Sequence, residues 1–246
     1  FPSELPTWAH MLRFAGYHTV LNGKMHFVGP DQLHGFHEHW NERTCPIDGF
    51  RWGEENPDST AGRRFWIDLH FEGDPVYEKR MAQETAIFHD AVDFLKNAPG
   101  DRPWCHVASF GGPHYPQIMP RELFDSYADT AIPEPASGPE GLHPRHQHWY
   151  RCWGFDRLSA ADNRIGRQAY LAMITQIDTW LGEILDALEK GGQARNTIIV
   201  YTADHGEMWA EHGLWGKQVF FEESAAVPLI VSAPGLGFRQ GAVVDT

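Results

Sequence analysis

Three short apolar segments of this chain each run into a cluster of polar residues and glycines, and this recurrence constrains the fold more than any other feature. The segments and their clusters are residues 18–22 with Gly23-Lys24-Met25-His26, residues 104–110 with Gly111-Gly112-Pro113-His114, and residues 197–203 with Asp204-His205-Gly206-Glu207. Apolar, β-branched segments separated by helical ones are typical of buried parallel strands. Because open α/β sheets bind ligands beyond the carboxyl ends of their strands, the pattern predicts that the three clusters meet in one crevice.

Helical patterns separate the predicted strands. Apolar residues recur at helical spacing in residues 5–15, 81–95 and 164–190. A further apolar segment, residues 226–233, predicts another buried strand, whereas residues 27–75 and 111–162 predict loop-rich regions. The alternation favours a single α/β domain over residues 1–246, with a mostly parallel central sheet flanked by helices.

Composition excludes several classes of protein. The formal net charge of −13 argues against nucleic-acid binding, because phosphate binding requires clustered Lys and Arg. No segment approaches the roughly 20 apolar residues of a membrane span. Cys45, Cys105 and Cys152 lack the spacing of a zinc site and are too few for a disulfide framework. The sequence offers no basis for assigning a compartment, and a homo-oligomer is left open.

The third cluster carries the strongest chemical signal. A carboxylate and an imidazole directly after a buried strand, here Asp204 and His205, are common metal ligands. The alternative is that these are simply polar residues at the end of a strand, with His205 hydrogen-bonded and not bound to a metal.

The first cluster has the residues of an anion-binding site. Lys24 and His26 would point the same way in extended geometry, so that Lys24 could bind an anion while His26 transfers a proton. The alternative there is a solvated Lys beside a capping His.

Two further residues are candidates because of their neighbours. His114 follows Gly111-Gly112-Pro113, which permits close backbone approach and stiffens the turn, although a lone loop His is more often simply exposed. Lys217 is a candidate because it lies near Asp204 in the sequence, although a single Lys usually faces solvent. His212 is equally suited as a ligand on chemistry alone and stays outside the candidate set.

A His-rich and aromatic stretch between the second and third clusters has a plainer interpretation. Residues 143–148 contain three of the 15 histidines but no element that would hold their geometry, so we expect a polar surface loop rather than a metal site. Trp149, Tyr150 and Trp153 could surround a ligand cation, yet packing is the commoner use of loop tryptophans.

Taken together and in this order, the motifs resemble the sulfatase family of the alkaline-phosphatase-like superfamily. Residues 16–19 and 23–36 look most like its choline-sulfatase branch. Residues 201–207, Gly216-Lys217 and residues 227–231 look like the family's second metal half-site and the strand that follows it. The resemblance runs nearly from end to end of the chain.

The resemblance implies hydrolysis of a small-molecule sulfate ester at one divalent metal ion by a formylglycine nucleophile. It implies that Asp204 and His205 hold the metal, with calcium as the first expectation and manganese, magnesium or zinc as alternatives. Lys24 and Lys217 would neutralise sulfate oxygens and leaving-group charge. His26 would assist release of sulfate, and His114 would hydrogen-bond or protonate the leaving oxygen.

One departure from the family pattern concerns the nucleophile. None of the three cysteines fits the C/S-x-P/A-x-R motif, and residues 59–63 fit it only loosely and on the wrong side of Lys24. We therefore expect an internal piece of a sulfatase: an incomplete core that lacks the N-terminal nucleophile segment and a C-terminal subdomain. Such a piece would be inactive alone and would bind metal weakly.

Two other functions remain open from the sequence. Phosphonate monoester hydrolases and phosphodiesterases share this scaffold, and their tetrahedral anion is nearly isosteric with sulfate. A non-catalytic metal- or anion-binding relative is the alternative from a different class.

Overall fold

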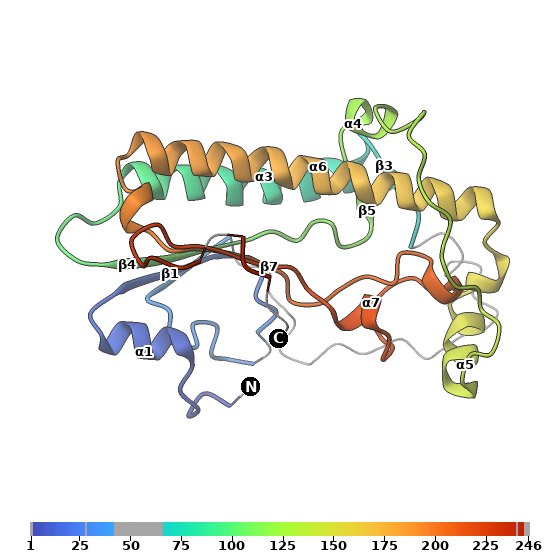
Figure 1. Ribbon diagram of the computed structural model, residues 1–246, viewed down its shortest axis with the longest axis horizontal. Helices are drawn as coiled ribbons and strands as arrows, with labels where there is room; N and C mark the ends of the chain where they lie inside the picture. The colour runs from blue at the N-terminus through green and yellow to red at the C-terminus, as the bar shows by residue number, and fades with distance from the viewer. Residues whose placement is uncertain (1, 28, 42–65, 240, 244–246) are drawn as a thin grey trace.

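The computed structural model describes residues 2–27, 29–41, 66–239 and 241–243. A parallel sheet of order β2-β1-β4 lies between helices, with α3 and α6 on one face and α1 on the other (Figure 1). The strands are β1 (His18–Gly23), β2 (Glu38–Trp40) and β4 (Trp104–Ser109), and the helices are α1 (Trp8–Phe14), α3 (Pro75–Lys96) and α6 (Ala160–Lys190). The predicted α/β class with a parallel sheet is confirmed.

The three helices begin at side-chain caps that the sequence supplies. Thr7 and Ser159 each start a capping box, with His10 and Asp162 as the reciprocal partners. The Asp74 carboxylate accepts from the Val76 N–H at 2.7 Å and starts α3. All three helices lie where the apolar spacing predicted them, although α1 is shorter than expected and α3 starts earlier.

Strand β1 forms the buried centre of the described sheet. Its neighbouring residues Val20 and Leu21 are both fully buried but face opposite layers. Val20 packs against Phe94 and Leu95 of α3 and against Leu188 of α6. Leu21 packs on the α1 side, in a cluster that contains Ala9 and Phe36. Because helices cover both faces of the sheet at β1, neighbouring residues of this strand are apolar instead of alternating with polar ones.

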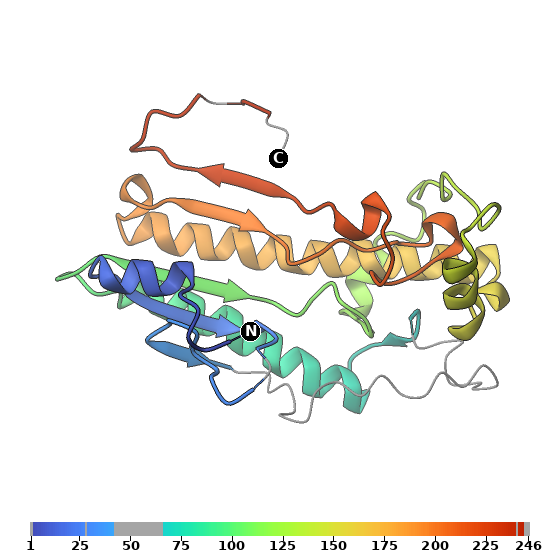
Figure 2. The same cartoon turned by 90° about the horizontal axis from the view of Figure 1, so that it is seen from below.

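The last two predicted strands differ from the expectation of burial in a parallel sheet. Strands β6 (Ile199–Thr202) and β7 (Leu229–Ser232) pair antiparallel and run alongside α6 (Figure 2). Ile199 packs against the cluster that contains Leu188, but Val200 is 56% exposed and Ile230 is 63% exposed. Apolar patterning located these strands, yet it could not specify their partners, because pairing depends on long-range contacts.

In the described residues, the elements of the connecting regions are short. They are β3 (Leu69–His70), β5 (Gln117–Ile118), α4 (Arg121–Asp125), α5 (Pro144–Cys152), η1 (Phe155–Arg157), η2 (Ala194–Asn196), η3 (Glu211–Gly213) and α7 (Glu222–Ala225). The His-rich stretch predicted to be a loop instead opens α5, because His143 caps the helix and Pro144 suits its first position. Cys45 and residues 59–63 lie outside the described residues. Among the described helices, none is long and apolar enough to span a bilayer.

Candidate active site

Lys24 is held at the carboxyl end of β1 by the neighbouring strand. Gly23 has φ 103°, and a Cβ there would lie 2.1 Å from the Ser109 carbonyl oxygen, so only glycine allows the two strand ends to approach this closely. The Lys24 N–H donates to that same carbonyl at 2.9 Å, and the Ser109 hydroxyl donates to the Lys24 carbonyl. The backbone of Lys24 is therefore anchored while its side chain extends toward Asp204.

Asp204 and His205 lie in the turn that follows β6. The Gly206 N–H donates to the Ser224 carbonyl of α7 at 2.9 Å and anchors this turn. His205 Nδ1 lies 2.8 Å from the Gly206 carbonyl oxygen, which can only accept, so Nδ1 carries the proton and Nε2 keeps its lone pair. His205 Nε2 lies 3.6 Å from Asp204 Oδ1. Two potential ligand atoms thus lie close together.

This donor set suits a divalent cation but makes only part of a coordination shell. The carbonyl behind His205 fixes the tautomer in the way typical of metal-bound histidines. Within the described part of the chain, no cluster of three or more His, Cys, Asp or Glu side chains is arranged to hold a metal ion. Burial acts to raise the pKa of Asp204, but nearby Lys24 and His205 outweigh it and leave the pKa below its ordinary value. The carboxylate is therefore ionised and ready to bind a cation.

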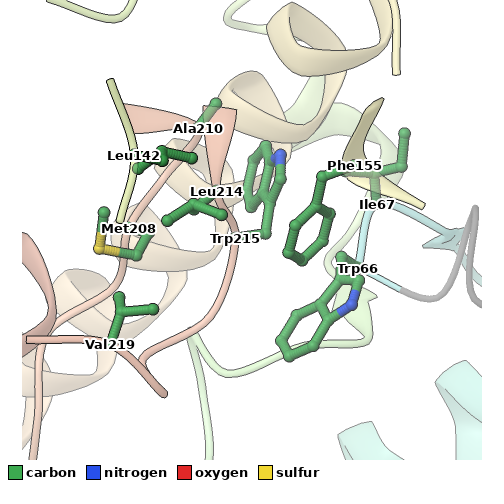
Figure 3. Packing of buried hydrophobic residues seen from close by; sticks show 9 residues of the cluster. All are labelled: Trp66, Ile67, Leu142, Phe155, Met208, Ala210, Leu214, Trp215 and Val219. Atoms are coloured by element: carbon green, nitrogen blue, oxygen red, sulfur yellow. The ribbon is translucent and has the colours of Figure 1, made fainter. Parts of the chain in front are cut away.

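The loop that carries Lys217 is shaped by a hydrophobic cluster and two polar clamps. Met208, Leu214, Trp215 and Val219 pack with aromatic residues of other loops (Figure 3). Glu207 Oε1 accepts from the Gly216 N–H at 2.5 Å and from the Trp209 N–H at 3.4 Å, which closes the loop. The buried Ser224 hydroxyl donates to the Lys217 carbonyl. Ser224 therefore ties the Lys217 backbone to the Asp204–His205 turn.

His114 and Lys217 form a direct pair. The His114 Nδ1–H donates to the Tyr115 carbonyl at 2.7 Å, so Nε2 is an acceptor and faces the Lys217 ammonium. Burial, reinforced by Lys217, lowers the pKa of His114 to about 3. Burial, with Lys24 nearby, lowers the pKa of Lys217 to about 8. The pair thus consists of a neutral imidazole and a lysine that holds its proton less tightly than usual.

Five of the six predicted residues lie together. Lys24 Nζ is 3.4 Å from Asp204 Oδ2, although 180 residues separate the two in the chain. The His114 and His205 rings are 6.0 Å apart, and Lys217 contacts His114. These five residues therefore lie close together, as predicted, but Asp204 and His205 follow β6, which pairs with β7 and not with the parallel sheet.

His26 is the exception. It has φ 56° and its side chain is exposed, and among the described residues no hydrogen bond or ion pair joins it to the other five. The prediction that it extends beside Lys24 in strand geometry is wrong, because the strand ends at Gly23 and the backbone turns before His26.

Other residues singled out in the sequence contribute to packing. Trp149, Tyr150 and Trp153 pack against the cluster around Trp66 instead of surrounding an open site. The His212 ring stacks on Phe221 at 4.1 Å.

Sequence reasoning gave no role to Glu207 and Ser224, whose side chains hold the backbone of the loop that carries Lys217. Glu207 stands in the third cluster and could have been noticed there. Ser224 carries no local signal, because only tertiary contacts give it a role.

The neutral state of His114 predicts acid-sensitive stability. Above pH 6.5 the imidazole is neutral in both states, but as pH falls from 6.5 toward 3 only the unfolded chain takes up the proton, so stability is lost. We expect the wild-type protein to lose roughly 2 kcal/mol more unfolding free energy between pH 7 and pH 4 than His114→Gln does. Urea unfolding at both pH values measures this difference, and equal losses would contradict a buried neutral imidazole.

Comparisons with known proteins place the chain among sulfatases. The Sulfatase family model matches residues 1–240. A choline-sulfatase from Rhizobium meliloti (strain 1021) is 38% identical over 256 residues, which cover 96% of this chain and 49% of the relative. The chain spans about half the length of the curated relatives it matches.

Solved structures share the fold at lower identity. An enzyme in complex with its substrate D-glucosamine-2-N,6-O-disulfate has a TM-score of 0.63 at 20% identity, covering 95% of this chain and 56% of that one. A phosphonate monoester hydrolase from Silicibacter pomeroyi has a TM-score of 0.62 at 23% identity, covering 96% and 54%. The family model accounts for nearly the whole chain, and the choline-sulfatase relative extends along the same length, so this chain belongs to the sulfatase family.

Proposed function

We propose that the protein hydrolyses a sulfate monoester at a single divalent-metal site. The observation that carries this proposal is the meeting of two lysines, a neutral His and an Asp–His pair beyond the ends of β1, β4 and β6, in a chain of the sulfatase family. Two ammonium groups match a tetrahedral anion, and the Asp–His pair matches a cation.

Asp204 and His205 would hold the metal, with further ligands from outside the described residues. When bound, the cation supplies Lewis-acid polarisation of a sulfate oxygen. Calcium is our first choice because of the carboxylate. An imidazole ligand also suits manganese or zinc, and magnesium remains an alternative.

The chain's own residues would bind and orient the ester. Lys24 and Lys217 neutralise the sulfate oxygens as negative charge shifts toward the leaving group. His114 accepts one N–H of Lys217 and so directs the remaining ammonium protons toward the leaving oxygen. With the pKa of His114 at about 3 and that of Lys217 at about 8, the lysine is the better proton donor and the His its orienting partner.

Two parts of the mechanism lie beyond these contacts. The formylglycine nucleophile would come from a segment outside this sequence, because no cysteine in it fits the motif. His26, which is exposed and two residues after Lys24 in the chain, would assist release of sulfate from the nucleophile after the alcohol has left.

A substrate panel on the full-length protein tests this function. We expect turnover of sulfate monoesters, with choline sulfate included because of the choline-sulfatase relative, and at least tenfold lower kcat/KM for matched phosphate and phosphonate esters. The 246-residue chain alone is the control and should show no turnover.

Phosphonate monoester hydrolysis is the second candidate, and the shared fold with such a hydrolase favours it over unrelated chemistries. A preference for phosphonate esters in the panel would establish it. Metal binding without turnover of any ester would establish the non-catalytic alternative.

A further inference from the structure

Glu84, on the middle of α3, is a buried acidic residue that the proposed chemistry does not use. Its side chain is only 5% exposed, although glutamate is almost never buried without partners. Glu84 Oε2 accepts from the Gly111 N–H at 2.8 Å and from the Gly112 N–H at 3.4 Å. A carboxylate on a helix therefore holds two successive amides of a loop 27 residues farther along the chain.

These two amides lie where β4 passes into the turn that carries His114. The turn is closed by the His114 N–H, which donates to the Gly111 carbonyl at 3.1 Å. The two ends of the turn thus have different anchors: Glu84 holds the amides at its start, and the Tyr115 carbonyl holds the His114 ring. Glu84, Gly112 and His114 also line the same cavity between α3 and α6.

Packing alone does not explain why an acidic side chain occupies the buried position of Glu84. An apolar residue of similar volume would fill the space, but it would leave the buried Gly111 N–H without this acceptor. Hydrogen bonds from amides to a carboxylate are roughly twice as strong as those between neutral groups. Glu84 therefore restrains the position of the turn more tightly than packing alone would.

We propose that Glu84 is a positioning residue that fixes the Gly111–His114 turn, so that His114 can orient the Lys217 ammonium toward the leaving oxygen. The effect on the orientation of Lys217 and on catalysis rests on the proposed function, whereas the fixing of the turn by Glu84 does not. Glu84 holds the amides of Gly111 and Gly112, so its effect on His114 passes through the backbone of the turn.

Leaving-group dependence separates this role from a general loss of stability. In the full-length protein we expect Glu84→Ala to lower kcat about thirtyfold for an alkyl sulfate, whose alkoxide needs a proton, with KM changed less than twofold. For 4-nitrophenyl sulfate, whose leaving group needs no proton, kcat should fall less than threefold. Glu84→Gln, which keeps an acceptor oxygen without the charge, should lie between Glu84→Ala and the wild type. Equal losses on both substrates would overturn the proposal.

An activity-independent measurement keeps the proposal testable if no sulfate ester is turned over. Hydrogen exchange of residues 110–116 should become at least tenfold faster in Glu84→Ala, because the Gly111 amide loses its acceptor. The matched control is Glu78→Gln, an exposed glutamate of the same helix, which should change neither exchange in this segment nor kcat. Unchanged exchange in Glu84→Ala would overturn the positioning role itself. Faster exchange without any wild-type turnover would support it while contradicting the proposed function.

Discussion

Replacing Lys217 by alanine is expected to lower kcat about a hundredfold in the full-length protein while leaving metal affinity nearly unchanged. Its ammonium contacts His114 and cannot ligate a cation, so it would act on the developing negative charge. Losing one such charged contact typically costs on the order of 3 kcal/mol in the transition state. Steady-state kinetics and metal titration by calorimetry measure the two effects separately.

The control for this variant is Lys190→Ala. Lys190 lies at the end of α6, where its side chain is 80% exposed and pairs with Asp186 on the same helix. It should leave both kcat and metal affinity at wild-type values. A fall in metal affinity for Lys217→Ala comparable to its fall in kcat would show that the assigned role is wrong.

Replacing Asp204 by alanine should instead lower metal affinity and activity together. The variant removes a charged ligand and leaves the Lys24 ammonium without its partner at 3.4 Å, which adds repulsion toward a cation. We expect affinity to fall by at least about a hundredfold, the upper value typical of losing a ligand's supporting partner. A metal titration followed by activity at each concentration measures both.

The two variants should separate in that titration. Excess metal partly restores activity to Asp204→Ala, because binding is what this variant lacks, and restores none to Lys217→Ala. Asp186→Ala, an exposed carboxylate on α6, serves as the control and should titrate like the wild type. Equal rescue of Asp204→Ala and Lys217→Ala would contradict the assignment of a ligand to one and an anion contact to the other.

The sequence by itself determined the class of fold and most of the candidate site. Alternation of apolar segments with helical spacing is a local property, and the capping residues Thr7, Asp74 and Ser159 are local as well. These signals located the main helices and strands. The rule that ligands gather beyond strand ends brought Lys24 and His114 together, because β1 and β4 are parallel and share one carboxyl edge. Asp204 meets them although its strand β6 pairs with β7 instead.

Only the tertiary structure decided how these residues act on one another. Lys24 and Asp204 pair across 180 residues, and the neutral state of His114 comes from burial reinforced by the Lys217 ammonium, while the Tyr115 carbonyl fixes which ring nitrogen carries the proton. Burial and long-range pairing depend on which elements pack together. For the same reason the exposed, antiparallel pairing of β6 with β7 contradicted the sequence pattern.

The positioning residues show the limit of sequence reasoning most clearly. Glu84 lies on a helix far from every motif, and Ser224 lies on a four-residue helix with no distinguishing pattern. Each is linked to the candidate site only because its side chain meets a backbone group of a loop that carries a candidate residue. A periodic pattern in the sequence indicates which face of a helix or strand is buried. It does not indicate which loop a buried polar side chain will contact, because that contact depends on how distant segments pack in three dimensions.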